Sequence, residues 1–183
     1  MVNTSLSTSV EIERNKIDHT VTKLGSMPLD TGLQQVHIKW LDSGKPVLEG
    51  LEKKAVNVSL SHDDHVCMCV AGYELQGCDI APVTRRTQQE WITLLSSARE
   101  PLMQQLLAVH DSLDQAGTRI WAAVEALRKA TNALEINLAI SRTEENCVLF
   151  QEVFSGSELK VLTFPIMLTR GPERMVALVV QNT

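Results

Sequence analysis

A single block of helical sequence, flanked on both sides by short strand-like segments, constrains most strongly what this chain can fold into. The block begins near Thr87, where Glu90 three residues later predicts a capping box. It resumes at Pro101 and ends in RIWAAVEALRKAT at 119–131, a segment rich in strong helix formers whose helix opens at Asp114 or Gly117. Apolar patterning predicts strands at 35–40, 56–61, 66–71, 76–83, 134–140, 147–154, 160–168 and 174–180.

The composition suits one domain or two small halves packed together, because 44% of the 183 residues are apolar. Residues 1–30 are polar and without a sustained period, so we interpret them as a linker or flexible arm preceding a domain at 31–183. The formal net charge of −5 argues against nucleic acid as a partner, and no apolar run approaches the roughly 20 residues that span a bilayer. With no apolar signal core, we expect a cytoplasmic protein and no membrane partner.

Four short stretches hold the residues suited to chemistry: Gly44-Lys45-Pro46, VSLSHDD at 58–64, QGCDIAPV at 76–83 and WAAVEALRKA at 121–130. In the last stretch Trp121, Glu125 and Lys129 are spaced four apart and share one helix face. Asp79 ends an apolar stretch, where a carboxylate is costly unless paired, hydrogen-bonded or bound to metal. Together Asp79 and Glu125 offer two oxygen ligands to Mg²⁺, which fills its other positions with water and phosphate oxygens.

Each stretch also has an ordinary interpretation when taken alone. Glu125 and Lys129 form a common i,i+4 pair, and Asp79 caps a turn or a helix. His62 is then a surface turn histidine, and Lys45 is a solvated lysine. The run at 62–65 is disfavoured as a metal site because adjacent strand residues point to opposite faces. Only the order and spacing of the four stretches separate the functional interpretation from the ordinary one.

Taken in order, the four stretches resemble the surfactin-type phosphopantetheinyl transferases over the region from Gly44 to Val180. That family has a GKP turn, a strand ending in S-H, a strand end G-[IV]-D and a helix with W-x-x-K-E-A-x-x-K. The matching residues are Gly44-Lys45-Pro46, Ser61-His62, Gly77-Cys78-Asp79 and Trp121 to Lys129. The segments GCDIAPV at 77–83 and GTRIWAAVEALRKA at 117–130 are most similar to transferase domains at the C-termini of enediyne-type iterative polyketide synthases.

The resemblance implies an α+β fold built from two similar halves related by a pseudo-twofold axis. The halves would fall at about 31–83 and 84–183, and each would have a small antiparallel sheet and a packed helix. It also implies an enzyme that transfers the 4′-phosphopantetheine arm of coenzyme A to a serine of an acyl carrier protein. The reaction depends on Mg²⁺ and releases 3′,5′-ADP. A carrier domain within the same polyketide synthase polypeptide is one candidate partner.

The family motifs assign a role to each matching residue. Asp79 and Glu125 are expected to converge on the Mg²⁺ ion, with Glu125 also the general base for the serine proton. Lys129 is expected to bind coenzyme A and to stabilise the transferring phosphate. The remaining coenzyme A contacts fall on Ser61 and His62, which hold phosphates, and on Lys45 and Pro46, which flank the adenine nucleotide.

Two positions depart from the family pattern. The second acid that often follows the aspartate is Ala81 here, and the lysine before the helix glutamate is Val124, for which Arg119 or Arg128 is a candidate replacement. These departures leave open a degenerate domain that binds coenzyme A or docks a carrier protein without transfer. An unrelated α/β scaffold also stays open, and it predicts that Asp79 and Glu125 lie far apart.

Overall fold

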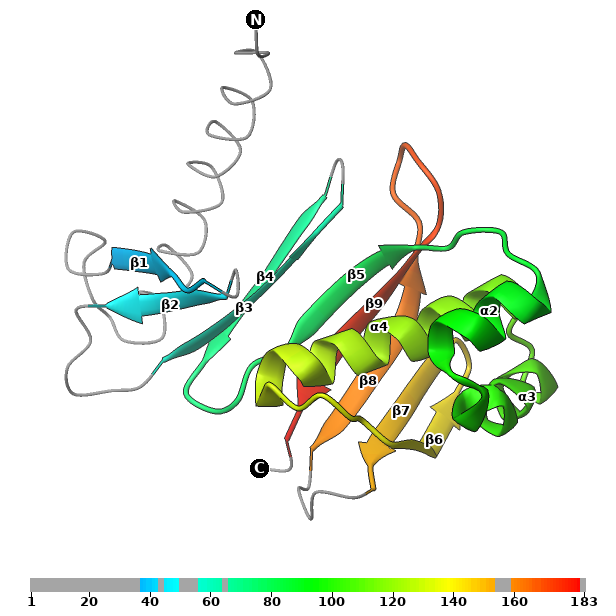
Figure 1. Cartoon of the computed structure of the whole chain (residues 1–183). Coiled ribbons are helices and arrows are strands. Elements are labelled where there is room, and N and C mark those ends of the chain that lie inside the picture. The colour runs from blue at the N-terminus through cyan, green and yellow to red at the C-terminus, as the bar shows by residue number, and fades with distance from the viewer. Residues whose placement is uncertain (1–36, 43–44, 50–55, 64–65, 154–158, 182–183) are drawn as a thin grey trace, which may run out of the picture. The chain divides into compact units, whose positions relative to one another are not determined.

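The computed structural model describes residues 37–42, 45–49, 56–63, 66–153 and 159–181. These residues form a mixed α+β structure with three α-helices and several antiparallel sheets, one of them five-stranded (Figure 1), which confirms the expected class at this level. The chain divides into two units, the first of residues 1–60 and 69–76 and the second of residues 61–68 and 77–183. The predicted arm at 1–30 lies outside the described residues.

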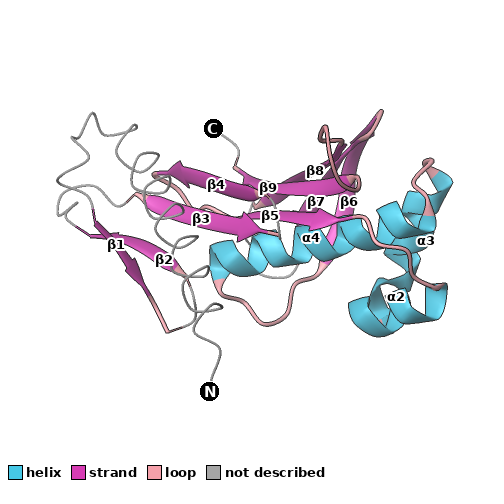
Figure 2. Ribbon diagram, turned by 90° about the horizontal axis from the view of Figure 1, so that it is seen from above, coloured by secondary structure: helices cyan, strands magenta, loops and turns pink. Residues whose placement is uncertain are grey.

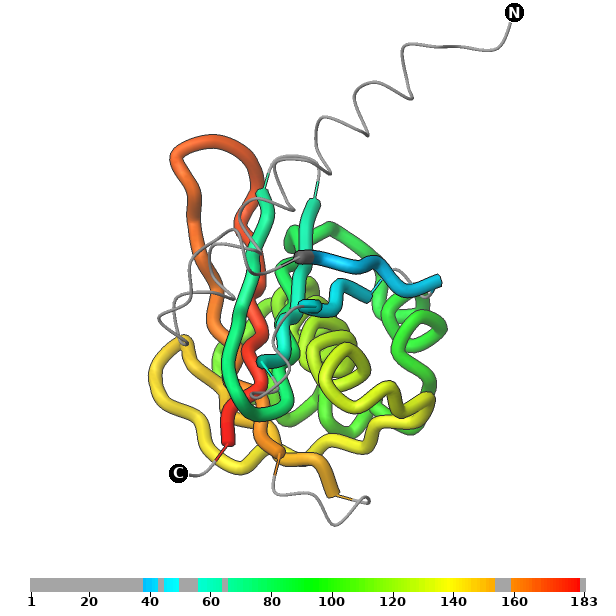
Figure 3. Tube along the Cα trace, turned by 90° about the vertical axis from the view of Figure 1, so that its left-hand side faces the viewer, coloured from blue at the N-terminus to red at the C-terminus, as the bar shows by residue number. Residues whose placement is uncertain are grey.

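The second unit is built on an antiparallel sheet in the order β5 (Cys78–Pro82), β9 (Arg174–Val180), β8 (Lys160–Ile166), β7 (Cys147–Glu152) and β6 (Leu138–Glu144). Helix α4 (Leu113–Thr131) lies along one face of this sheet and packs mainly on β9, β5 and β8, as the edge-on view in Figure 2 shows. Figure 3 shows the orange and red strands β8 and β9 beside the yellow-green coil of α4. Helices α2 (Gln88–Leu95) and α3 (Glu100–Ala108), joined by a 3₁₀ turn at Ser97–Arg99, pack against α4.

The core of the second unit lies between α4 and the sheet. The helix contributes a stripe of fully buried apolar residues at helical spacing, and the strands contribute the residues that face it. The helix residues are Ile120, Ala123, Val124 and Leu127, and the strand residues are Phe150, Val161, Met175 and Ala177. Burial of this face, more than helix propensity, holds α4 in place.

Helix starts follow the local capping chemistry. Helix α2 begins as predicted, with a capping box between Thr87 and Glu90. Helix α4 begins at Leu113, earlier than predicted, because Ser112 and Gln115 form the neutral version of the same box. Strand β6 begins at Leu138 rather than 134, since two carbonyls just before it accept hydrogen bonds from arginines: Arg128 to Leu134 and Arg99 to Ile136.

The first unit holds short paired strands. Strand β1 (His37–Trp40) pairs antiparallel with β2 (Pro46–Glu49). Only the first residue of β2, Pro46, carried a prediction, as the end of a turn. Strand β3 (Asn57–His62) pairs with β4 (Cys67–Gly72), and both strands pass from one unit into the other. Strand β5, which the sequence placed in the first half, belongs to the second unit. None of the described helices is both long and apolar enough to cross a membrane.

Gly77 allows β5 to approach α4 more closely than any other residue type would permit. A Cβ built at Gly77 would lie 2.0 Å from the carbonyl oxygen of Ala126, which is backbone and cannot move aside. We expect Gly77→Ala to lower the free energy of unfolding by about 1–3 kcal/mol, the usual cost of overpacking. Urea denaturation measures this loss. In the control Gly72→Ala the new Cβ meets only the flexible end of Gln76, so an equal loss in both variants would contradict this account.

Candidate active site

Strand β5, together with Gly77 just before it, presents alternate residues to α4. Gly77 faces the helix backbone, Asp79 contacts Lys129 of the helix, and Ala81 lines a pocket together with Trp121. This alternation is the two-residue period of a strand. The face of α4 that carries Trp121 and Lys129 therefore runs along the Asp79 side of β5, and Glu125 lies on that face between them.

Asp79 is a buried carboxylate held by two donors. Its residue is 6% exposed, and its Oδ1 accepts hydrogen bonds from Ser61 Oγ and from Lys129 Nζ, each at 2.7 Å. Within the described part of the chain, both hydrogen bonds to this carboxylate end on Oδ1. The second oxygen, Oδ2, is therefore left to accept a further donor or a cation.

Ser61 ties the end of β3 to β5. Its hydroxyl donates to Asp79 and accepts the backbone N–H of Ile80 at 3.1 Å, and the residue is 5% exposed. Two residues later Asp63 forms a partly buried ion pair with Arg174 of β9, with Oδ2 and Nε 2.5 Å apart. Because the hydroxyl proton of Ser61 goes to Asp79, Ser61 orients that carboxylate here, and its predicted contact with phosphate stays a prediction.

Lys129 brings the positive charge of α4 to this carboxylate. Its ammonium donates to Asp79 Oδ1 and to the carbonyl oxygen of Cys78 at 3.1 Å. About a third of the side chain is exposed, so the charge also faces solvent. The predicted phosphate-binding lysine thus lies against the predicted metal ligand.

Glu125 lies one turn before Lys129, and its carboxylate is paired with Arg128. The distance from Arg128 Nη1 to Glu125 Oε1 is 2.8 Å, and Arg128 Nη2 donates to the carbonyl oxygen of Leu134 at 3.3 Å. Arg128 also acts on a second arginine, Arg99. Burial is the main reason that the pKa of the Arg99 guanidinium is lowered, and the positive charge of Arg128 lowers it further. Convergence of Glu125 with Asp79 on one ion stays a prediction.

The remaining predicted residues are His62, Lys45 and Pro46. His62 follows Ser61 and is exposed. Lys45 and Pro46 belong to the first unit, where the buried Pro46 opens β2 opposite Trp40, and Gly44 lies outside the described residues. Their predicted contact with the adenine nucleotide stays a prediction.

The structure shows why position 124 carries no lysine and where the two candidate replacements, Arg119 and Arg128, lie. Val124 is 4% exposed and packs in the core, so this position faces the sheet. Arg119 is 1% exposed and forms a two-pronged ion pair with Asp111, at 2.6 and 2.8 Å, while donating to Thr163. The expectation that Arg119 could replace the missing lysine is therefore wrong, because its donors are used within the core. Arg128, which pairs with Glu125, is still a candidate replacement for the motif lysine that Val124 lacks.

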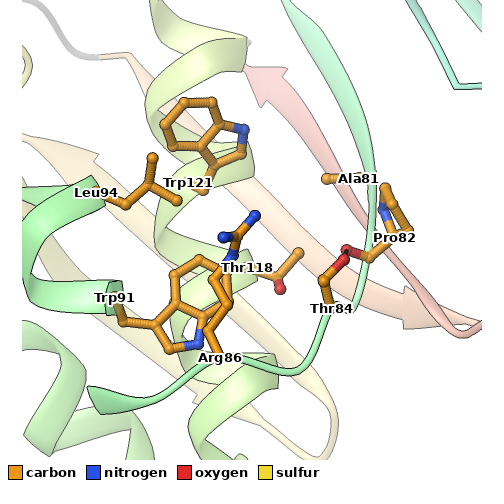
Figure 4. Close-up of a pocket in the computed structure, with 8 residues that line it drawn as sticks. All are labelled: Ala81, Pro82, Thr84, Arg86, Trp91, Leu94, Thr118 and Trp121. Carbon is orange, nitrogen blue, oxygen red and sulfur yellow. Dashed lines mark hydrogen bonds between the residues drawn. The ribbon is translucent and has the colours of Figure 1, made fainter. Parts of the chain in front are cut away.

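A pocket of about 220 Å³ is lined by residues of β5, of the segment that follows it, of α2 and of α4 (Figure 4). Trp91 and Trp121 line it, together with Ala81 and Thr118, and the guanidinium of Arg86 lies 5.3 Å from the ring centroid of Trp91. The Trp91 indole is fixed because its Nε1 donates to Asp114 at 3.2 Å. The pocket is mainly apolar with one cation, and none of the sequence motifs predicted it.

The donor set limits which metals the site could hold. The described residues contain no group of three or more His, Cys, Asp or Glu side chains able to hold a metal ion. Asp79 and Glu125 would supply two carboxylates, which fits Mg²⁺ when phosphate oxygens of a substrate and water complete the shell. A zinc site, which usually takes four protein ligands when structural, does not fit this set.

No protein-family model and no curated protein matches this chain. The resemblance to phosphopantetheinyl transferases therefore rests on the motif residues alone.

Proposed function

We propose that this chain is a 4′-phosphopantetheinyl transferase that moves the phosphopantetheine arm of coenzyme A onto a serine of an acyl carrier protein. One observation carries the proposal. Ser61, Asp79 and Lys129 come from three separate stretches that the sequence assigned to a single site, and they form one hydrogen-bonded cluster. A pseudo-twofold pair of halves, with coenzyme A between them, is the arrangement that this proposal entails.

The residues of the cluster suit a phosphoryl displacement. The serine oxygen of the carrier attacks the β-phosphate of coenzyme A, its proton passes to Glu125, and the bond to 3′,5′-ADP breaks. Lys129 neutralises charge on the transferring phosphate, and Ser61 keeps the Asp79 carboxylate in place. In such reactions positioning and charge neutralisation account for most of the rate, and this cluster provides both.

Asp79 and Glu125 are the residues that would hold Mg²⁺. When bound, the ion neutralises the pyrophosphate and orients its oxygens. The open Oδ2 of Asp79 and the partly exposed carboxylate of Glu125 support this assignment. Asp79 lies on β5, and Glu125 lies on the face of α4 that runs along this strand.

Release of 3′,5′-ADP tests the proposal. The chain is incubated with coenzyme A, Mg²⁺ and an apo acyl carrier protein, and the nucleotide products are separated by chromatography. We expect 3′,5′-ADP to form only when all three are present and to disappear when EDTA is added. Nucleotide release without the carrier would instead indicate hydrolysis of coenzyme A.

A second function is favoured by the pairing of Glu125 with Arg128 and by the buried Val124. Because the Glu125 carboxylate is paired with Arg128 and position 124 carries no cation, the domain would bind coenzyme A or a carrier protein without transferring the arm. Calorimetry distinguishes the two functions. Binding of Mg²⁺ and coenzyme A with no nucleotide release, even with several carrier proteins, would favour this alternative.

The adjacent pair Arg85-Arg86 predicts where an acidic carrier protein docks. Both residues are exposed and precede α2, and the chain as a whole has a formal charge of −5, so docking needs a local basic patch. We expect charge reversal at both positions to slow association with the carrier and to flatten its salt dependence. Stopped-flow measurements at low and high salt check this prediction.

Two controls accompany this measurement. Charge reversal at Arg142, an exposed residue of the edge strand β6, should leave carrier kinetics unchanged. Affinity for coenzyme A should be the same in all variants. Unaltered carrier kinetics in the Arg85-Arg86 double variant at both salt concentrations would remove this pair from the docking surface.

A further inference from the structure

Lys129 already supplies a positive charge to Asp79, on the oxygen Oδ1. Its ammonium lies 2.7 Å from Asp79 Oδ1 and 3.1 Å from the carbonyl oxygen of Cys78, so a positive charge is already bound to two oxygens at the strand end. Ser61 donates to the same Oδ1 and therefore orients the carboxylate toward this arrangement. The negative charge of Asp79 is thus largely neutralised by the protein itself.

Glu125 is in the same situation, because Arg128 lies 2.8 Å from its carboxylate. Each of the two predicted metal ligands is therefore paired with a cation of α4. A free divalent ion must displace or share these cations, and it meets two compensated carboxylates instead of two open ones. A pyrophosphate changes this balance, because its oxygens offer Lys129 and Arg128 new anionic partners while they also coordinate the ion.

We propose that Lys129 acts as an internal competitor of the metal ion, so that the site takes a divalent cation together with a pyrophosphate and excludes the free ion. The inference rests on the proposed function. It goes beyond that function by naming the species that binds, a metal–pyrophosphate complex, and by giving Lys129 a role before the reaction begins. During binding Lys129 passes from the carboxylate of Asp79 to a phosphate oxygen.

Titration of the chain with Mn²⁺ alone, followed by electron paramagnetic resonance of the free ion, tests this inference. We expect weak binding to the unmodified chain and at least about fivefold tighter binding to Lys129→Met, about 1 kcal/mol at 1.4 kcal/mol per tenfold. Lys129→Gln is the second variant, because it keeps a neutral donor beside Asp79 if the methionine variant does not fold. Arg142→Met, at an exposed ion pair on β6, is the matched control and should bind Mn²⁺ as the unmodified chain does.

The outcomes separate the inference from the proposed function. Unchanged or weaker Mn²⁺ binding in a folded Lys129 variant would overturn the inference, as would tight Mn²⁺ binding to the unmodified chain in the absence of coenzyme A. The proposed function is tested in a separate arm, in which coenzyme A is titrated into the unmodified chain with and without Mg²⁺. Failure of coenzyme A to bind in both conditions would contradict the function, whatever the Mn²⁺ titrations give.

Discussion

Asp111→Ala is expected to lower the free energy of unfolding by about 3–5 kcal/mol, because it leaves a buried guanidinium without its counter-ion. Arg119 is 1% exposed and is held by both carboxylate oxygens of Asp111, with Thr163 and the carbonyl of Asn146 as its other partners. Removal of Asp111 removes the negative charge and keeps the cost of burying the positive one. Chemical denaturation measures the loss directly.

A double variant separates the loss of the charge pair from the loss of packing. Replacing both partners, as Asp111→Ala with Arg119→Met, should cost clearly less than Asp111→Ala alone, because no unpaired charge stays buried. Glu144→Ala breaks an exposed ion pair on β6 and should cost at most about 1 kcal/mol. Similar losses of unfolding free energy in Asp111→Ala and Glu144→Ala would show that the buried pair stabilises the fold no more than the exposed pair does.

Asp79→Asn is expected to reduce carrier-protein modification by about 100-fold or more, the range found when one group that stabilises developing charge is removed. Asparagine has the same shape, and its amide oxygen can still accept from Ser61 and Lys129, so the strand end should keep its conformation. What the variant loses is the negative charge that, under the proposed function, would hold the divalent cation. Initial rates measured under saturating coenzyme A and Mg²⁺ give the change.

Thermal unfolding of the same variant ensures that a loss of rate reflects chemistry. We expect Asp79→Asn to unfold within a few degrees of the unmodified chain, and its affinity for coenzyme A to lose most of its dependence on Mg²⁺. An Asp79→Asn variant that retains a rate near that of the unmodified chain would exclude Asp79 as a metal ligand.

The elements with strong local patterns were predictable from sequence. The capping box at Thr87, the strong helix formers of α4 and the strands after residue 146 each follow local rules, and the structure has them at or near the predicted positions. Strand β2 was missed because the turn residues just before it dominate the local signal and its four residues are too few to show a period. Strand β6 begins four residues later than predicted because distant arginines take the carbonyls before it.

Three of the candidate residues could be expected to lie together, but their pairings could not be predicted. The motif order identified Ser61, Asp79 and Lys129, and the structure brings these three into contact. No local pattern shows that Lys129 would pair with Asp79, fifty residues earlier. Glu125 has two cations within one helical turn, Arg128 at i+3 and Lys129 at i+4, and the structure pairs it with Arg128 instead of with Lys129. The buried pair of Arg119 and Asp111 was missed for the same reason, although an arginine inside the apolar run of α4 was a signal that a partner was needed.

The central claim is transfer of phosphopantetheine to a carrier-protein serine, and intact-mass spectrometry tests it most directly. An apo acyl carrier protein is incubated with this chain, coenzyme A and Mg²⁺, and its serine-to-alanine variant serves as the control substrate. The account predicts that the carrier gains the mass of one phosphopantetheine group, and that the gain is absent with EDTA, with the alanine carrier or with Asp79→Asn. A carrier whose mass stays unchanged, under conditions in which the chain binds coenzyme A and the carrier is modified by a known transferase, would contradict it.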